Sequence, residues 1–399
     1  MTPRTIPVSM PDLSGNEQAY AAEAVASSWI SSTGPFLDRF EREFAEACGT
    51  AHAIATSNGT TALHLALATL GVGSGDEVIV PSMTYIATAN AVTYCGGKPV
   101  FVDIDPDNWC LNPRLIEAAI TRHTKGIIPV HLLGHPADMD AINTVAATHG
   151  LWVVEDAAEA TFATYKGRPV GSLARAATFS FFGNKIISCG EGGAVTFDDA
   201  GLQRRMRMLR GQGMDPARRY HFPIVGFNYR LTNVAAAILC GQMERREVIV
   251  RRRREIVAIY AGELADVPGI GLRQDADWAD TAPWLASCLV DPGLFGCRRD
   301  DLAESLADRG IETRPMFIPI HRMPPYHDAA RKRRTELPVT DRLGSLGLML
   351  PTYPQMADDD VRFICEAIRD IGARQMQTRR SVAMARIASP DPSRRARAA

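Results

Sequence analysis

The sequence has no long apolar run, no closely spaced cysteine pair and almost no net charge. Without a run of about 18 apolar residues, no transmembrane helix is expected, and the first residues lack the apolar core of a signal peptide. Eight scattered cysteines without a C-x-x-C pair argue against a metal site or a disulfide framework, and favour reduced thiols in the cytoplasm. A net charge of −1 provides no field that would attract nucleic acid or a membrane. We therefore expect a cytoplasmic protein that has no metal and binds neither nucleic acid nor a membrane.

The composition is that of an ordinary globular protein. The 399 residues are 46% hydrophobic and 22% charged. This length suits a large domain together with a smaller one.

Short apolar runs alternate with helical segments through the first half of the chain. A helical stretch over 15–48, with Phe36, Phe40 and Phe44 on one face, precedes them. The expected strands are 52–55, 77–81, 99–103, 126–131 and 151–155, and the expected helices are 60–70, 86–94, 113–120 and 139–149. Such alternation predicts an α/β domain with a mostly parallel mixed sheet covered by helices. Two further runs, 177–182 and 193–197, are too close for a helix between them and should pair antiparallel.

The pattern changes in the last third of the chain. Residues 232–264 are expected to form one long helix, and its Arg251–Arg254 run is typical of a solvated helix face or an intersubunit salt-bridge surface. Beyond it, a strand over 284–290, a helix over 299–309 and a segment 311–317 indicate a smaller α+β domain. We therefore expect a large domain over 1–264 and a small C-terminal domain over 265–373.

The last segment, 374–399, has a composition of its own. It contains seven arginines, one acidic residue and two prolines. With little apolar content to bury, it is expected to be disordered. We expect an extension without a function, and contact with an anionic partner remains an alternative.

The segment Thr178-Phe-Ser-Phe-Phe-Gly-Asn-Lys185 is the most informative part of the sequence. Its lysine ends an aromatic, strand-like run and precedes the glycine-rich turn Gly190–Gly193. Partial burial there would favour the uncharged amine, which can attack an aldehyde and form a Schiff base. Alone, the same pattern also fits a lysine that extends from a strand end into water.

Four other elements decide between these interpretations of Lys185. They are a helix start at Gly59 and Thr60, Tyr85 after the strand 77–81, Asp156 after the apolar strand that begins at Leu151, and Ser180 five residues before the lysine. In order, they can bind an anion with backbone N–H groups, stack on a flat ring, hold a heteroaromatic nitrogen protonated, and donate to a phosphate. Each could also have a purely structural role, as a helix cap or a packing residue. Pyridoxal 5′-phosphate is the cofactor that uses all five roles together.

The chain resembles the DegT/DnrJ/EryC1/StrS family of sugar aminotransferases, which are fold-type I pyridoxal-phosphate enzymes. The matching segments are Ser57–Thr60, Glu155–Ala158, Ser180–Lys185, Gly190–Gly193 and Gly226–Arg230, within a match over about 7–372. Within the family the likeness is to the branch that makes GDP-perosamine, and it is carried by Thr84–Gly96, Ala177–Lys185, Leu209–Pro216 and Gly310–Pro315.

The resemblance implies a homodimer with active sites at the subunit interface. Asn228 would then reach the cofactor phosphate of the partner. Glu159 stands where many relatives have Gln or His beside the phenolic oxygen of the cofactor, so it must be protonated or point elsewhere. Relatives that dehydrate sugars have His in place of Lys185, so this chain should aminate.

The expected reaction is transamination in two half-reactions. L-glutamate would donate its amino group through Lys185 and Asp156, and a nucleotide-linked 4-keto-6-deoxy sugar would accept it. Arg230 and Arg314 are candidates for binding the donor carboxylate or the sugar diphosphate, and His321 and Tyr326 are candidates for the sugar pocket. Amination at C3 of a GDP-linked sugar, as in mycosamine formation, and a non-catalytic sensor built on the same fold remain alternatives.

Overall fold

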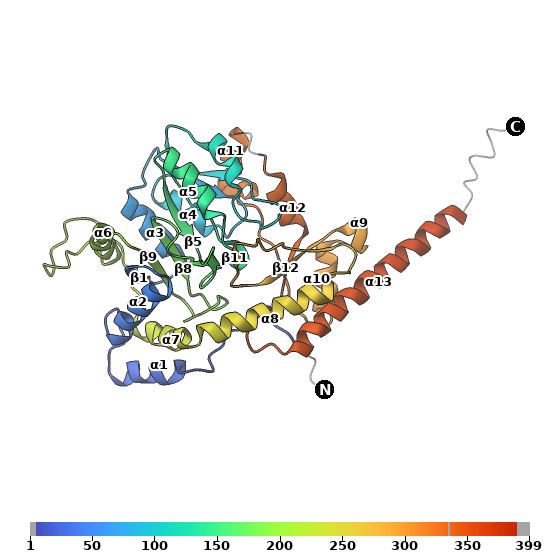
Figure 1. Cartoon of the computed structure of the whole chain (residues 1–399), viewed down its shortest axis with the longest axis horizontal. Coiled ribbons are helices and arrows are strands. Elements are labelled where there is room, and N and C mark those ends of the chain that lie inside the picture. The colour runs from blue at the N-terminus through green and yellow to red at the C-terminus, as the bar shows by residue number, and fades with distance from the viewer. Residues whose placement is uncertain (1–4, 334–335, 389–399) are drawn as a thin grey trace.

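The computed structural model describes residues 5–333 and 336–388, and its centre is a seven-stranded sheet (Figure 1). The strand order is β1-β9-β8-β5-β4-β2-β3, and only β9 runs against the others. The strands are β1 (His52–Thr56), β2 (Glu77–Pro81), β3 (Lys98–Val102), β4 (Thr124–Ile127), β5 (Trp152–Asp156), β8 (Ala176–Ser180) and β9 (Gly193–Phe197). The expected mostly parallel mixed sheet and the antiparallel β8–β9 pair are both confirmed.

Helices cover both faces of this sheet. They are α1 (Glu17–Ala26), α2 (Pro35–Ala47), α3 (Gly59–Leu70), α4 (Ala87–Tyr94), α5 (Met139–Thr148), α6 (Ala200–Arg210), α7 (Asn233–Glu244) and α8 (Arg246–Leu264). Successive residues of a strand enter opposite cores: Ile79 packs with the cluster of α2, α5 and α7, whereas Val78 and Val80 pack with that of α3, α4 and α6. Burial on both faces explains why the strands are continuous apolar runs rather than alternating ones.

A second, four-stranded sheet follows α8. Its antiparallel strands are β10 (Ile270–Leu272), β12 (Ala286–Val290), β14 (Gly347–Leu350) and β13 (Arg314–Pro315). The helices that follow α8 in the chain are α9 (Pro292–Phe295), α10 (Arg299–Ala307), α11 (Pro324–Lys332), α12 (Pro338–Leu346) and α13 (Asp358–Ala388), of which α11 packs on the first sheet. A third small sheet joins β6 (Thr164–Tyr165), β7 (Arg168–Pro169) and β11 (Ala279–Asp280). The proposed domain boundary at residue 264 coincides with the end of α8.

Four expected elements differ in the structure. The helical stretch over 15–48 is two helices, α1 and α2, separated by the non-helical residues 27–34. The helix over 113–120 is two short 3₁₀ turns, Pro113–Leu115 and Glu117–Ala119. The long helix over 232–264 is broken at Arg245, where φ and ψ are −106° and 2° and the guanidinium binds Asp12 at 2.9 Å. Within 311–317, only Arg314 and Pro315 form a strand. Tertiary contacts therefore override a helix periodicity that is continuous in sequence.

The expectation of disorder from residue 374 is wrong for residues 374–388, because α13 continues to Ala388, with its last turns projecting away from the rest of the chain (Figure 1). An existing helix extends at the cost of ordering one residue per new hydrogen bond, and Ala, Arg, Gln and Met are strong helix formers. The remainder of the expected tail, 389–399, lies outside the described residues. In the described part of the chain, no helix is long and apolar enough to cross a membrane.

The arginine run of α8 is only partly a solvated face. Arg252 binds Asp358 of α13 at 2.7 Å. Arg253 is 1% exposed, and its Nη1 donates to the carbonyl oxygens of Trp284 and Thr352 at 2.7 and 3.0 Å. Burial lowers the pKa of Arg253 to about 10. The run thus ties α8 to the C-terminal sheet.

Candidate active site

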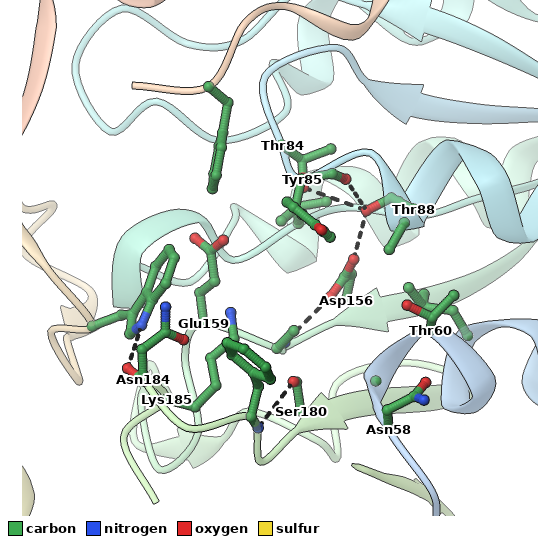
Figure 2. A pocket seen from close by; sticks show the side chains of 18 of the residues that line it. Asn58, Thr60, Thr84, Tyr85, Thr88, Asp156, Glu159, Ser180, Asn184 and Lys185 are labelled. Carbon is green, nitrogen blue, oxygen red and sulfur yellow. Dashed lines mark hydrogen bonds between the residues drawn. The ribbon is translucent and has the colours of Figure 1, made fainter. Parts of the chain in front are cut away.

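A cavity of about 430 Å³ opens at the carboxyl ends of β5 and β8, where open α/β sheets bind ligands. Its wall combines residues from both ends of the chain. Of the residues predicted from the sequence, those that line it are Gly59, Thr60, Tyr85, Asp156, Glu159, Ser180, Lys185 and Arg314. Figure 2 shows Lys185 and Glu159 on one side and Asp156 on another, with Ser180 facing the helix that carries Thr60.

Lys185 lies in the loop that joins β8 to β9. Its backbone N–H donates to the Phe182 carbonyl at 2.9 Å, which closes a tight turn. The residue is half-buried. Desolvation in the cavity lowers the pKa of its amine, although the carboxyl groups of Glu159 and Asp156 oppose the shift. A larger unprotonated fraction is what a nucleophilic or base-acting lysine requires.

Asp156 is the last residue of β5 and is buried. Its Oδ2 accepts a hydrogen bond from Thr88 Oγ1 at 2.7 Å, and its Oδ1 accepts one from Ala158 N at 3.2 Å (Figure 2). Burial raises the pKa of this carboxyl, and the two hydrogen bonds partly offset the rise. The arrangement leaves a carboxyl in the cavity that would gain from a positively charged N–H partner.

Glu155, the neighbour of Asp156, points to the opposite face of the sheet. Its oxygens accept from Gly171 N and Leu173 N and lie 3.0 Å from His131 Nε2. Since Nδ1 of His131 accepts from Ala137 N at 3.0 Å, the ring proton is assigned to Nε2. This network anchors β5. Of the two neighbouring carboxyl groups, Asp156 lies in the cavity and Glu155 does not.

Glu159 also faces the cavity and is buried. Its Oε2 accepts from the backbone N–H of Leu133 at 2.8 Å, and Leu133 has the left-handed φ of 54°. Burial raises the pKa of Glu159. A protonated Glu159 is therefore compatible with an anionic oxygen beside it, which is one of the two states allowed by the sequence.

The start of α3 forms the other end of the cavity. Asn58 caps the helix by accepting from Thr61 N at 2.9 Å, and the first residue of the helix, Gly59, lies against Ser180 at the end of β8. At Gly59 there is no room for a side chain, because a Cβ would lie 2.8 Å from Ser180 Cβ. Backbone N–H groups and a hydroxyl in this arrangement suit a phosphate.

Asn228 and Arg230, both predicted from the sequence, do not line the cavity of this chain. Asn228 is exposed, and its Oδ1 accepts from Arg230 Nη2 at 3.4 Å. Arg230 is half-buried in the same segment. Neither contacts the cavity within one protomer.

His321 and Tyr326 were expected at the sugar pocket, but the structure places both away from the cavity. His321 Nδ1 lies 2.8 Å from Ser82 Oγ, and Tyr326 Oη donates to Asn90 Oδ1 at 2.7 Å. Both side chains are buried. Their polar atoms fasten the end of β2 and helix α4 to the C-terminal segment, since buried polar groups require partners.

Several lining residues were not found from the sequence. Thr88 binds Asp156, and its only signal is its place one turn after Thr84. Trp284 and Phe317 come from the C-terminal domain, and no local pattern relates them to the lysine loop. Tyr85 is 60% exposed and forms an edge contact with Phe317, with ring centroids 6.1 Å apart.

The model of the DegT/DnrJ/EryC1/StrS aminotransferase family matches residues 11–369. A curated relative from Caulobacter vibrioides, named GDP-perosamine synthase, is 48% identical over 92% of this chain and 98% of its own. The solved structure of DesV from S. venezuelae, in complex with a ketimine intermediate, is 39% identical, covers 93% of this chain and 99% of its own, and gives a TM-score of 0.86. The PLP form of the sugar aminotransferase Spr1654 from Streptococcus pneumoniae is 27% identical over 93% and 100% of the two chains, with a TM-score of 0.87.

Proposed function

This chain belongs to the DegT/DnrJ/EryC1/StrS aminotransferase family, and from that premise we propose that it transfers the amino group of L-glutamate to a nucleotide-linked keto sugar with pyridoxal 5′-phosphate as cofactor. The observation that carries this proposal is the meeting of Lys185, Asp156 and the start of α3 in one cavity. We place the reaction in the cytoplasm.

The residues present fit this cofactor. Gly59 and Thr60 at the start of α3, together with Ser180, would bind the phosphate, and the missing side chain at Gly59 lets Ser180 lie close to the start of the helix. Asp156 would hold the ring nitrogen protonated, and Tyr85 would cover one ring face. When bound, pyridoxal phosphate supplies an aldehyde that amines attack and a ring that withdraws electrons.

Proton movement in the proposed reaction belongs to this chain. The Nζ of Lys185 would take the proton from the α-carbon of the donor and deliver it within the cavity. Asp156 would keep the ring nitrogen of the cofactor protonated. A buried carboxylate without a positive partner is unfavourable, so the charged pair is favoured at this site. Glu159 would hold a proton beside the phenolic oxygen.

Gly59→Ala is expected to weaken cofactor binding by roughly 10-fold or more. The new Cβ would approach Ser180 Cβ to 2.8 Å and force α3 away from β8, and such overpacking costs about 1–3 kcal/mol. Equilibrium titration of the apo-protein with pyridoxal phosphate would measure the change. Gly73→Ala is the matched control, since a Cβ there meets nothing within 4 Å. Equal affinities for the two variants would contradict the assignment.

We propose that the functional unit is a homodimer and that Asn228 of each protomer serves the cofactor phosphate of the other. The exposure of Asn228 and its distance from the cavity of its own chain support a role in trans. Tyr220, Phe222 and Val225 in the adjoining segment are also exposed, and a second copy would bury them.

For the substrate, we propose a GDP-linked 4-keto-6-deoxymannose that is converted to GDP-perosamine. The similarity to the Caulobacter vibrioides relative supports this choice. Arg314 lines the cavity and has only a distant ion pair, with Glu312 at 3.6 Å, so its guanidinium can bind a diphosphate or a donor carboxylate.

The test is a substrate panel. The protein would be incubated with pyridoxal phosphate, L-glutamate and 4-keto or 3-keto sugars linked to GDP, dTDP or UDP, and aminated products would be identified by mass and NMR. We expect 4-amination of the GDP-linked 4-keto sugar. Product from another nucleotide or at C3 would reject the substrate choice, and no product from any sugar would reject the sugar aminotransferase assignment.

A further inference from the structure

One wall of the lysine pocket is an aromatic ring from the C-terminal domain. The Nζ of Lys185 lies 4.0 Å from the ring centroid of Trp284. A cation at this distance over an indole face is attracted by the negative face of the ring, and the attraction is largest where water is excluded. Trp284 is 5% exposed, so the contact is a buried one.

Trp284 is held in place from three directions. Its indole N–H donates to the carbonyl of Asn184, the residue before Lys185, at 2.7 Å. Its ring stacks on Phe317 at a centroid distance of 6.4 Å and an interplanar angle of 19°. Its own carbonyl accepts from the buried guanidinium of Arg253. The ring is therefore fixed both to the lysine loop and to α8.

We propose that Trp284 is a positioning residue for Lys185, whose ring face stabilises the protonated amine and confines it when the lysine is not bound to cofactor. The proposal rests on the assignment of Lys185 as the reacting amine, but it concerns a residue from another domain. It also gives a role to Arg253, which holds Trp284 from behind.

Charged groups near the Lys185 amine also affect its protonation, and the effect of the Trp284 ring is added to theirs. Asp156 and Glu159 favour the ammonium form, and burial of the lysine opposes it. Glu191 and Arg314 are the other charged residues on the cavity wall. The face of Trp284 favours the ammonium without adding a negative charge. The amine can therefore be protonated and deprotonated within one confined position, as a proton-carrying base requires.

The test measures the pKa of Lys185 in the full-length apo-protein, independently of turnover. Acetic anhydride would label amines over a range of pH, and mass spectrometry would follow the peptide that contains Lys185. Trp284→Leu removes the ring face and the N–H, whereas Trp284→Phe keeps a weaker ring and loses only the N–H. We expect the leucine variant to lower the pKa of Lys185 by roughly one unit and the phenylalanine variant to lower it less. The exposed Lys125 should label identically in all proteins.

A third protein, with fluorinated tryptophan, shows whether the pKa shifts come from the ring face rather than from misfolding of the variants. Uniform incorporation of a multiply fluorinated tryptophan keeps the shape and the N–H donor and weakens the ring face, so the pKa of Lys185 should again fall. An unchanged or higher pKa with the fluorinated ring, or equal shifts for the leucine and phenylalanine variants, would overturn the proposal. A protein that aminates no sugar but shows the expected pKa shifts would reject the proposed function and leave the role of Trp284 intact.

Discussion

Lys185→Ala is expected to lower transamination by at least about 10³-fold, because one substitution removes both the amine that reaches the cofactor and the base that moves the proton. The chain offers no substitute at this position. Among the residues that line the cavity, Lys185 is the only lysine. Initial rates with L-glutamate and the accepted keto sugar would measure the loss.

The same variant should lose covalent attachment of the cofactor. After treatment with borohydride, the parent protein should retain pyridoxal phosphate at Lys185, and the variant should retain none after denaturation. Lys125→Ala is the matched control, since this lysine is exposed and its ion pair with Asp76 is long, at 4.0 Å. The activity and the cofactor attachment of this variant should equal those of the parent. Full turnover by the Lys185 variant would refute the assigned role.

The sheet could be predicted because its strands are buried on both faces. In such strands, hydrophobicity is continuous over about five residues, and helical segments separate most of the runs, so much of the order of elements follows from local pattern. The β8–β9 pair was predicted for a related reason, since the apolar runs 177–182 and 193–197 are too close for a helix between them.

Local pattern failed where distant contacts decide the conformation. The periodicity over 232–264 is continuous, yet the chain turns at Arg245, whose side chain reaches Asp12 near the other end of the sequence. Similarly, the arginine-rich composition of 374–399 predicts disorder, but residues 374–388 extend an existing helix. A prediction of disorder from composition takes no account of a helix that precedes the segment and can continue into it.

The candidate site shows the same division. Asp156, Ser180 and Lys185 follow strand ends, so their convergence could be inferred from the sheet. Trp284 reaches the site from the segment before β12 of the second sheet and has no such signal. His321 has the residue type expected of a sugar pocket, but it is buried against Ser82, because residue type alone does not reveal the direction of a side chain.

Asp156→Asn is expected to reduce transamination by about 10²–10³-fold, a loss typical of removing one charged group that stabilises a reacting centre. A neutral amide does not hold the ring nitrogen protonated, so the ring would withdraw electrons poorly. Substitution by Asn keeps the size of the side chain. The hydroxyl of Thr88 can still donate to one oxygen, and the lost acceptor is the one that binds Ala158 N.

The same variant should make the apo-protein more stable at neutral pH, which separates loss of function from misfolding. Burial raises the pKa of Asp156 above its ordinary value of 3.8, so the folded chain binds more protons than the unfolded chain between the two pKa values. Stability therefore falls as the pH rises through that window, and above it the buried charge remains a constant cost. An asparagine does not ionise, so it removes both the pH dependence and the cost.

Thermal unfolding of the two apo-proteins from pH 4 to pH 8 would test this sign. The parent should lose stability relative to Asp156→Asn as the pH rises, and the variant should have the higher melting temperature at pH 7. With pyridoxal phosphate the order should reverse, because only the carboxylate gains a charged partner. Asp328→Asn changes an exposed carboxyl that is 81% accessible and should alter neither curve. A variant that is less stable than the parent at every pH, with and without cofactor, would show that Asp156 serves the fold rather than the cofactor.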